Sequence, residues 1–197
     1  MFFGYLKKLL TLKFMKIDQA FKFIKSDFIR YGENPTLLNI LVNIFFVKNQ
    51  SFCYSFWLRL SGIEKPYCYF PRYMWRKLSK KYGIQIHPAS KIGYGLYLGH
   101  GVGIIINYRT IIGNNCNVSH FVSIGSNEGQ SAIIGDNVYI GPSVCIVEDV
   151  NIGDNASIGA GAVVTRDVPN NATVAGVPAK VLNYNSPGRY IEYRAEI

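Results

Sequence analysis

The stretch IGDNVYIGPSVCIVEDVNIGDNASIGAGAVV, residues 134–164, carries a branched aliphatic residue at every sixth position. Neither an α-helix, with 3.6 residues per turn, nor one long strand, with its two-residue alternation, has this period. Short strands separated by tight corners do have it. One aliphatic side chain then points inward from each strand, and the backbone turns at the glycines and polar residues between them.

The same period reaches back to residue 86, with a two-residue insertion after Leu98 and a longer step at GSNEGQSA (125–132). The thirteen anchor positions are Ile86, Ile92, Leu98, Ile106, Ile112, Val118, Ile124, Ile134, Ile140, Ile146, Ile152, Ile158 and Val164. Three short strands form one triangular coil, and successive coils share parallel ladders about 4.8 Å apart. The pattern therefore predicts a mainly β fold, a parallel β-helix of about four coils. We expect the loop 125–132 to project from it.

Residues 1–83 have a different sequence pattern, which is typical of helices. Apolar residues recur there at spacings of three and four, and proline and glycine interrupt the pattern at 32–35 and 64–67. We expect a small α-helical region at 1–83, then the β-helix at 84–169 and a C-terminal segment at 170–197. The four helices are expected at 15–31, 35–47, 50–63 and 69–82. The start, MFFGYLKKLLTLKF, lacks a cleavage site, and we do not expect a signal peptide.

The net charge of +9 is concentrated in the helical region. Residues 1–83 hold 15 Lys and Arg against 4 Asp and Glu, a balance of +11, whereas residues 84–197 hold 6 against 8, a balance of −2. Such a basic, aromatic-rich region is either an ordinary solvated lysine face or a surface that meets an anionic membrane. No nucleic-acid-binding motif accompanies the charge, and no nucleic acid is expected as a partner.

The cysteines and the apolar runs indicate the cellular compartment in which the protein is expected. The four cysteines show no disulfide spacing, which suits a reducing compartment. No apolar run reaches the ~20 residues that span a bilayer. We therefore expect a cytoplasmic protein, with peripheral contact at the inner membrane surface left open.

Two histidines occupy equivalent places in the repeat. His100 and His120 each follow an anchor by two residues, and 20 residues separate them, one 18-residue coil plus the insertion. Both side chains are expected at the same outward-facing corner of successive coils. A neutral imidazole there is either a general base or a hydrogen-bonded surface residue. His87 falls on another side of the triangle and is expected to be structural.

The stretches 134–182 and IHPASKIGYGLYLGHGVGIII (86–106) resemble the hexapeptide-repeat acyltransferase family, and within it the serine acetyltransferase-like branch. The resemblance covers roughly residues 84–182. It implies a left-handed β-helix, a homotrimer and acetyl-CoA as acetyl donor, and it leaves open a pairing of two trimers through the N-terminal helices. It also implies that His100 is the general base and that His120 assists it.

The resemblance suggests where the two substrates bind, and no metal is expected. The candidate CoA-binding residues are Gly125, Ala160, Gly161, Arg166, Ala175, Gly176 and Lys180. The candidate acceptor-binding residues are Gln85, Gly99, Asn107, Glu128 and Ser131.

Three of the acceptor positions depart from the branch. Gln85 and Gly99 stand where it has aspartates, and Ser131 falls near a loop histidine. Burying the ammonium and carboxylate of free serine without charged partners costs free energy. The sequence therefore favours a neutral acceptor. We expect an O-acetyltransferase acting on a sugar hydroxyl in surface polysaccharide biosynthesis (capsule, exopolysaccharide or lipopolysaccharide), with the glycan free or linked to a lipid or nucleotide.

Three alternatives stay open. The first is serine O-acetylation for cysteine biosynthesis. The second is a zinc β-helix similar to the γ-type carbonic anhydrases, although His87, His100 and His120 do not have the spacing of that metal site. The third is a trimeric scaffold without catalytic activity.

Overall fold

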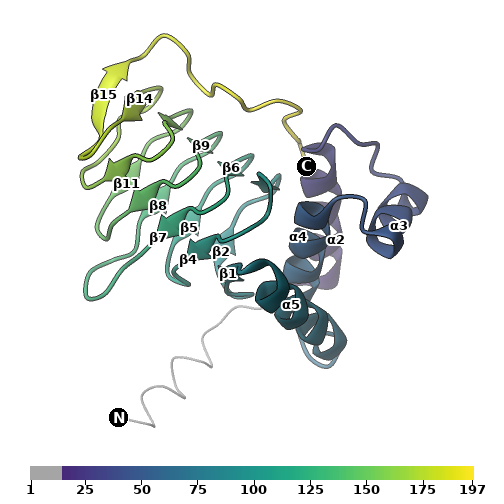
Figure 1. Cartoon of the computed structure of the whole chain (residues 1–197). Helices are drawn as coiled ribbons and strands as arrows, with labels where there is room; N and C mark the ends of the chain where they lie inside the picture. Colours follow the sequence, from purple (N-terminus) through teal and green to yellow (C-terminus); the bar gives the residue numbers. More distant parts are fainter. Residues whose placement is uncertain (1–14) are drawn as a thin grey trace.

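A β-helix makes up most of the computed structural model, which describes residues 15–197 (Figure 1). Residues 1–14, where we expect no signal peptide, lie outside the described residues. The strands are β1 (Gln85–Ile86), β2 (Lys91–Ile92), β3 (Tyr97–Leu98), β4 (Ile105–Ile106), β5 (Ile111–Ile112), β6 (Asn117–Val118), β7 (Ser123–Ile124), β8 (Ile133–Ile134), β9 (Tyr139–Ile140), β10 (Cys145–Ile146), β11 (Asn151–Ile152), β12 (Ser157–Ile158), β13 (Val163–Val164), β14 (Thr173–Ala175) and β15 (Lys180–Asn183).

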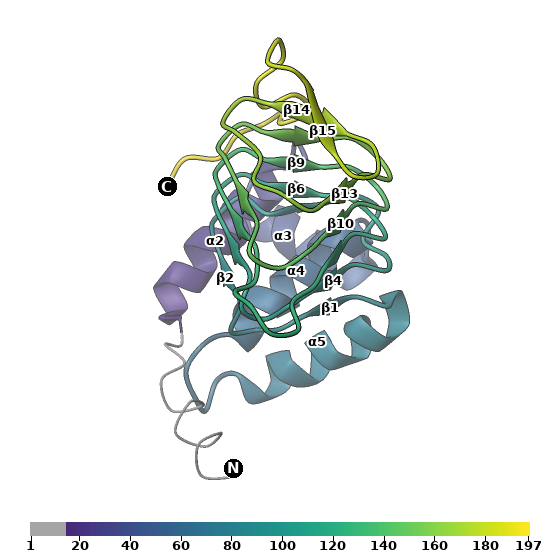
Figure 2. The same cartoon turned by 90° about the vertical axis from the view of Figure 1, so that its left-hand side faces the viewer.

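The chain winds around three faces, and Figure 2 shows the three-sided outline of the coils. The first face carries β1, β4, β7, β10 and β13, the second β2, β5, β8 and β11, and the third β3, β6, β9, β12, β14 and β15. Pairing is parallel except between β14 and β15. The loop 125–132 between β7 and β8 extends beyond the outline of the other coils (Figure 1).

Every anchor residue is the second residue of its strand, and all thirteen anchors are buried. They form one continuous core along the axis of the prism. The predicted mainly β class and the left-handed parallel β-helix of about four coils are therefore confirmed.

The corners recur because the backbone takes a left-handed conformation at the same place in successive coils. Asn115, Asn137 and Asn155 have φ of 53°, 56° and 57°. Asparagine tolerates this region better than most residues because its short polar side chain bonds locally. The Asn155 side chain, for example, donates to Asn171 of the next coil at 3.2 Å.

Four helices cover the N-terminal end of the β-helix, as the sequence predicts: α2 (Ile17–Ile29), α3 (Leu37–Phe46), α4 (Gln50–Ser61) and α5 (Tyr69–Tyr82). Thr36 and Asn49 cap α3 and α4 by accepting backbone N–H bonds from Asn39 and Phe52. Such caps satisfy donors that a helix start leaves unpaired.

A buried ion pair fastens the helices to the first coil. Arg59 on α4 donates to both carboxylate oxygens of Asp27 on α2, at 2.9 and 3.0 Å. The same guanidinium donates to the carbonyls of Ile92 and Gly93, and Asp27 accepts the Leu96 N–H at 2.7 Å. One pair of side chains thus joins two helices and the turn between β2 and β3.

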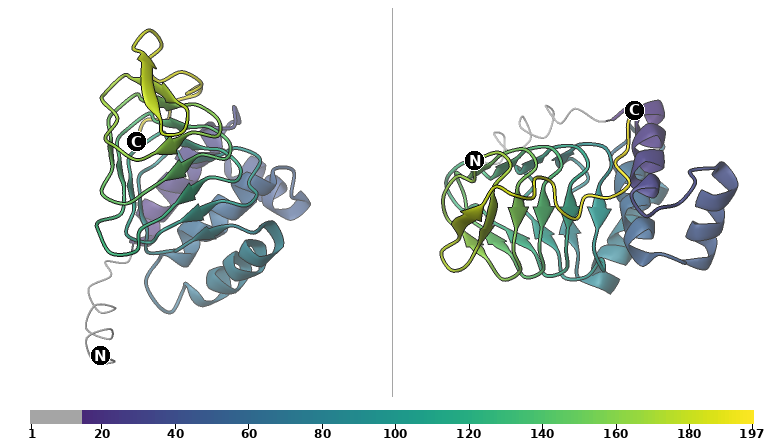
Figure 3. Two further views of the ribbon diagram at one scale, coloured as in Figure 1. Left: turned by 60° about the vertical axis from the view of Figure 1, so that its left-hand side comes forward. Right: turned by 90° about the horizontal axis from the view of Figure 1, so that it is seen from above.

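The last residues of the chain return along the third face to the helices (Figures 1 and 3). We call residues 186–197 the C-terminal strap. The Gly188 N–H donates to the Asn155 carbonyl, and Asn117 donates to the Tyr190 carbonyl. The Asn115 amide makes two bonds to the backbone of Ala195, at 2.9 and 3.0 Å. The strap is therefore an ordered part of the fold.

Replacement of Asp27 by Asn is expected to lower the free energy of unfolding by roughly 3–5 kcal/mol, because it leaves the Arg59 charge buried without a counter-charge. Urea unfolding followed by circular dichroism measures this. The exposed Asp18 of the same helix is the control, and its change to Asn should cost less than about 1 kcal/mol. Equal losses in the two variants would contradict the role given to the pair.

Candidate active site

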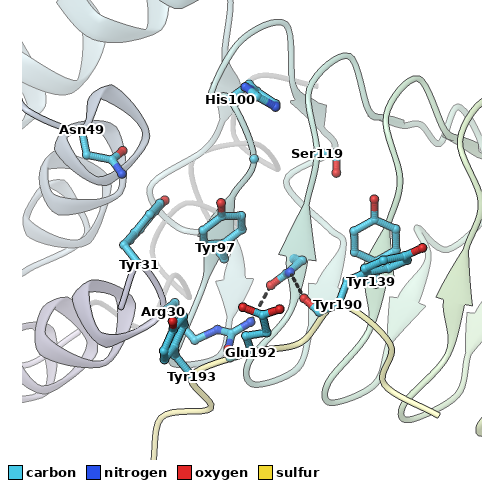
Figure 4. A pocket seen from close by; sticks show the side chains of 12 residues that line it. Arg30, Tyr31, Asn49, Tyr97, His100, Ser119, Tyr139, Tyr190, Glu192 and Tyr193 are labelled. Carbon is cyan, nitrogen blue, oxygen red and sulfur yellow. Dashed lines mark hydrogen bonds between the residues drawn. The ribbon is translucent and has the colours of Figure 1, made fainter. Parts of the chain in front are cut away.

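A pocket of about 480 Å³ opens where the helices, the third face and the C-terminal strap meet (Figure 4). Its lining comes from three parts of the chain: Arg30, Tyr31 and Asn49 from the helical region, Tyr97, Gly99, His100, Asn117, Ser119 and Tyr139 from the β-helix, and Tyr190, Glu192 and Tyr193 from the strap. Figure 4 shows His100 at one end of this pocket and the strap at the other.

His100 and His120 lie at the same corner of successive coils, as their spacing predicts. Their ring centroids are 5.1 Å apart and their planes are nearly perpendicular, at 84°. His100 is exposed, with φ of 61°. Histidine is among the residues that enter this left-handed region more readily than others.

Helix α4 holds the His100 corner in place. The Gln50 side chain donates to the His100 carbonyl at 2.8 Å. The next residue, Gly101, has φ of 45°, and a Cβ there would come within 2.5 Å of the Ser51 hydroxyl and 3.0 Å of the Ser51 Cα. Only glycine allows the start of α4 to lie this close, so the corner is rigid on its backbone side while the imidazole faces solvent.

His120 presents a ring nitrogen without a partner among the described residues. Its Nδ1 is buried and makes no hydrogen bond, and its ring lies 5.3 Å from the Phe121 ring. Buried polar atoms are nearly always paired, and exceptions point to functional positions. This nitrogen is able to exchange a hydrogen bond with a ligand or with the neighbouring imidazole.

Arg30 is the cation of the pocket and connects its walls. It donates to the Gly95 carbonyl, to the Asn117 side chain and to the Glu192 carbonyl. Burial lowers the pKa of Arg30, but a guanidinium of this kind stays charged at neutral pH.

Tyr31 stays a neutral phenol. Burial raises the pKa of Tyr31, and its oxygen accepts the Leu98 N–H at 3.2 Å. The pocket wall is thus polar but carries few charges.

The strap and the helical residues of the pocket have no counterpart in the repeat pattern, and sequence reasoning missed them. Tyr190 packs its ring on Tyr139 with centroids 4.8 Å apart, and Ile191 is buried. The signal was the composition of the tail, since RYIEYRAEI (189–197) has five apolar or aromatic residues among its charges, which is unusual for a solvated end.

Of the predicted acceptor-binding residues, only Gly99 lines the pocket. The Ser131 hydroxyl is buried against Thr110 at 2.7 Å, and the Asn107 amide donates to the Ser126 carbonyl. Gln85 is exposed on β1, and Glu128 is exposed in the loop 125–132.

Two carboxylates order the loop 125–132: Asp149 accepts the Gln130 N–H at 2.8 Å, and Glu148 binds the loop at three places. Glu148 accepts backbone N–H bonds from Asn127, Glu128 and Gly129, at 2.7, 3.2 and 3.4 Å. These bonds lower the pKa of Glu148. The loop therefore has a fixed shape beside the first face.

The predicted CoA-binding residues lie outside the pocket, most of them in the last coils. Ala160, Gly161 and Gly176 are exposed, and the Val163 N–H donates to the Gly176 carbonyl at 3.0 Å. Arg166 and Lys180 are exposed, Ala175 is half-buried in β14, and Gly125 follows β7. A Cβ built at Gly125 or Gly161 meets no atom within 4 Å, so the surface there is open. Their role in binding CoA stays a prediction.

The third histidine is apart from the other two, and its ring contacts Tyr108. Burial lowers the pKa of His87, and the nearby Arg72 adds to this effect. Among residues 15–197 no three His, Cys, Asp or Glu side chains are grouped as metal ligands.

The repeat is similar to a known family of transferases and to known proteins. The family model described as bacterial transferase hexapeptide (six repeats) matches residues 131–166. A mitochondrial serine acetyltransferase 3 of Arabidopsis thaliana is 41% identical over 110 residues, 54% of this chain and 28% of that protein. A serine acetyltransferase of Synechococcus elongatus is 36% identical over 104 residues, 51% of this chain and 43% of that protein. The chain thus spans less than half the length of these curated relatives.

Solved structures extend the likeness into the helical region. A serine acetyltransferase of Neisseria gonorrhoeae in complex with serine has a TM-score of 0.68 and 30% identity, covering 85% of this chain and 70% of its own. A serine acetyltransferase in complex with CoA has a TM-score of 0.63 and 26% identity, covering 84% of this chain and 69% of its own.

The prediction of a sugar hydroxyl of surface polysaccharide as acceptor is wrong, because these relatives and structures are serine acetyltransferases. The prediction gave too much weight to Gln85 and Gly99. Most of the pocket wall comes from other segments, so two positions of the repeat do not decide the acceptor.

The change Ala195→Asp is expected to release the strap, because Ala195 is buried and taking a carboxylate out of water at this position costs free energy. Trypsin should then cleave after Arg189 about tenfold faster or more, since cleavage requires local unfolding of the strap. Mass spectrometry of timed digests measures the rate. The exposed neighbour Glu196, changed to Ala, is the control, and an unchanged rate in the Ala195 variant would show that the strap is not docked.

Proposed function

Because the chain belongs to the hexapeptide-repeat transferase family, we propose that it is an acetyl-CoA-dependent O-acetyltransferase whose acceptor is the hydroxyl group of serine. The observation that carries this proposal is the His100 corner. An exposed imidazole stands at the end of a pocket, beside a second imidazole with a free nitrogen, in a chain similar to serine acetyltransferases over its helices as well as its coils.

His100 is the proposed general base. Its neutral imidazole takes the proton of the acceptor hydroxyl as the oxygen attacks the acetyl carbonyl. An oxygen–carbon bond forms, the carbon–sulfur bond of the thioester breaks, and the proton held by His100 passes to the leaving CoA thiolate. Backbone N–H groups at the glycine-rich corners are the proposed donors to the oxyanion.

His120 is the proposed partner of this base. From a ring-centroid distance of 5.1 Å, it can orient the acceptor or the His100 ring, or share the charge that develops. Because Gly99 brings no carboxylate, we propose that neutral groups of the pocket, such as Asn49, Tyr97 and Ser119, bind the polar groups of the amino acid.

The donor is proposed to lie along the last coils, where Ala160, Gly161, Ala175 and Gly176 leave room next to the backbone and Arg166 and Lys180 offer charge to its phosphates. We also propose a homotrimer in the cytoplasm, with the division into 1–83, 84–169 and 170–197 as its functional parts. Among residues 15–197 no helix is long and apolar enough to cross a membrane.

Thiol release from acetyl-CoA tests the acceptor. With the purified chain we expect thiol release that depends on L-serine and exceeds the release with D-serine, nucleotide sugars or glycans. The reason is that the proposed pocket binds the polar groups of L-serine specifically. A rate with L-serine no higher than without acceptor would refute serine as the substrate.

The change His100→Ala is expected to lower kcat by roughly 10²–10⁴, the usual range for the loss of a general base. His100 is exposed, so the variant should keep the circular dichroism spectrum and midpoint of the parent. His87→Ala serves as the matched control and should retain turnover. Near-parental kcat in the His100 variant would place the base elsewhere.

A further inference from the structure

Helix α3 turns an apolar face to solvent. Four of its side chains, Leu37, Leu38, Leu41 and Phe45, fall within one 100° arc of the helix, at 100° per residue. They are 68%, 69%, 41% and 78% exposed, and the adjoining Phe46 is 75% exposed. We call these five residues the α3 outer face.

The helix is ordered in spite of this exposure. Its inner side holds Ile40, buried in a cluster with Phe28 and Phe52 of α2 and α4. The segment Leu37–Phe46 contains no charged residue. Contiguous exposed apolar side chains of this kind mark interaction sites, whereas single ones are ordinary.

The α3 outer face lies at the extremity of the molecule. Figure 3 shows α3 at the end opposite to β14 and β15. No other described element covers these side chains, so a flat partner can reach them.

The helical region that carries this face also exposes basic and aromatic side chains. Lys48, two residues after the end of α3, is exposed. Helix α5 exposes Tyr69, Phe70 and Tyr73 near its start and Lys77 and Lys80 nearer its end. A ring contact between Trp57 and Phe70, with centroids 5.5 Å apart, joins α4 to the start of α5. Apolar and aromatic side chains together with lysine and arginine are typical of surfaces that bind the interface of anionic membranes.

Charge decides between a membrane and a second copy of the chain. Among the described residues of the helical region, 15–83, twelve Lys and Arg stand against four Asp and Glu, an excess of eight positive charges. Two copies meeting through this region would bring like charges together, which opposes association, whereas an anionic lipid surface complements them. Ten residues are too few to span a bilayer, so α3 would lie in the interface.

We infer that the α3 outer face docks this protein on an anionic lipid surface. The apolar side chains enter the headgroup region and the basic side chains of the helical region contact lipid phosphates. This inference is independent of the acceptor of the reaction.

Co-sedimentation of the full chain with vesicles tests it. The parent protein should pellet with phosphatidylcholine vesicles that contain phosphatidylglycerol and remain in solution with phosphatidylcholine alone, and added salt should release it. In the variant Leu38→Glu/Phe45→Glu the bound fraction should fall by about tenfold or more, because two charges enter the apolar face.

Leu182→Glu is the matched control, since Leu182 is 62% exposed on β15 at the other end of the molecule. It should bind vesicles as the parent does, and circular dichroism should show that both variants are folded. The inference fails if the parent stays in solution with anionic vesicles, or if the double variant binds them as the parent does. It also fails if light scattering without lipid shows that the double variant halves the mass of the parent, because the face then belongs to a second copy.

Discussion

The structure depends on one packing constraint, which is that each short strand places a single branched aliphatic side chain inside a three-sided prism. Since the coils are in register, the inward side chains of successive coils stack on one another along the axis. The position of every outward residue then follows from its distance to the nearest anchor. His100 and His120 lie next to each other for this reason, although 20 residues separate them.

Interactions at the N-terminal end convert this regular stack into a specific site. The Asp27–Arg59 pair fixes the helices on the first coil, and the start of α4 lies against the His100 corner through Gly101. Without the helices the corner would be one of several equivalent corners. With them it becomes the end of a pocket whose other walls are polar and aromatic. The geometry of the candidate site comes from the junction of the helices with the β-helix rather than from the repeat alone.

The parts of this arrangement that are periodic could be read from the sequence, and the others could not. The six-residue period determined β1 to β13, the thirteen core positions and the shared corner of the two histidines, but not β14 or β15. The hydrogen bonds of Ser131 to Thr110 and of Asn107 to Ser126 could not be predicted, because a residue's place in the repeat does not say which neighbour takes its hydrogen bonds. The contact between Arg30 and Glu192 could not be predicted from the sequence for another reason. Their contact joins residues 162 positions apart, and no local pattern encodes the path of the strap.

The strap has a consequence for how the molecule comes apart. In a solenoid each turn touches only its neighbours, so the terminal turns fray without disturbing the rest. Here the segment that leaves the last strand is bound to Asn155, Asn117 and Asn115 and ends against the first helices. Unfolding of the C-terminal coils therefore also disrupts the strap that lines the pocket. The stack of coils unfolds more cooperatively than an open solenoid would, because its two ends are connected.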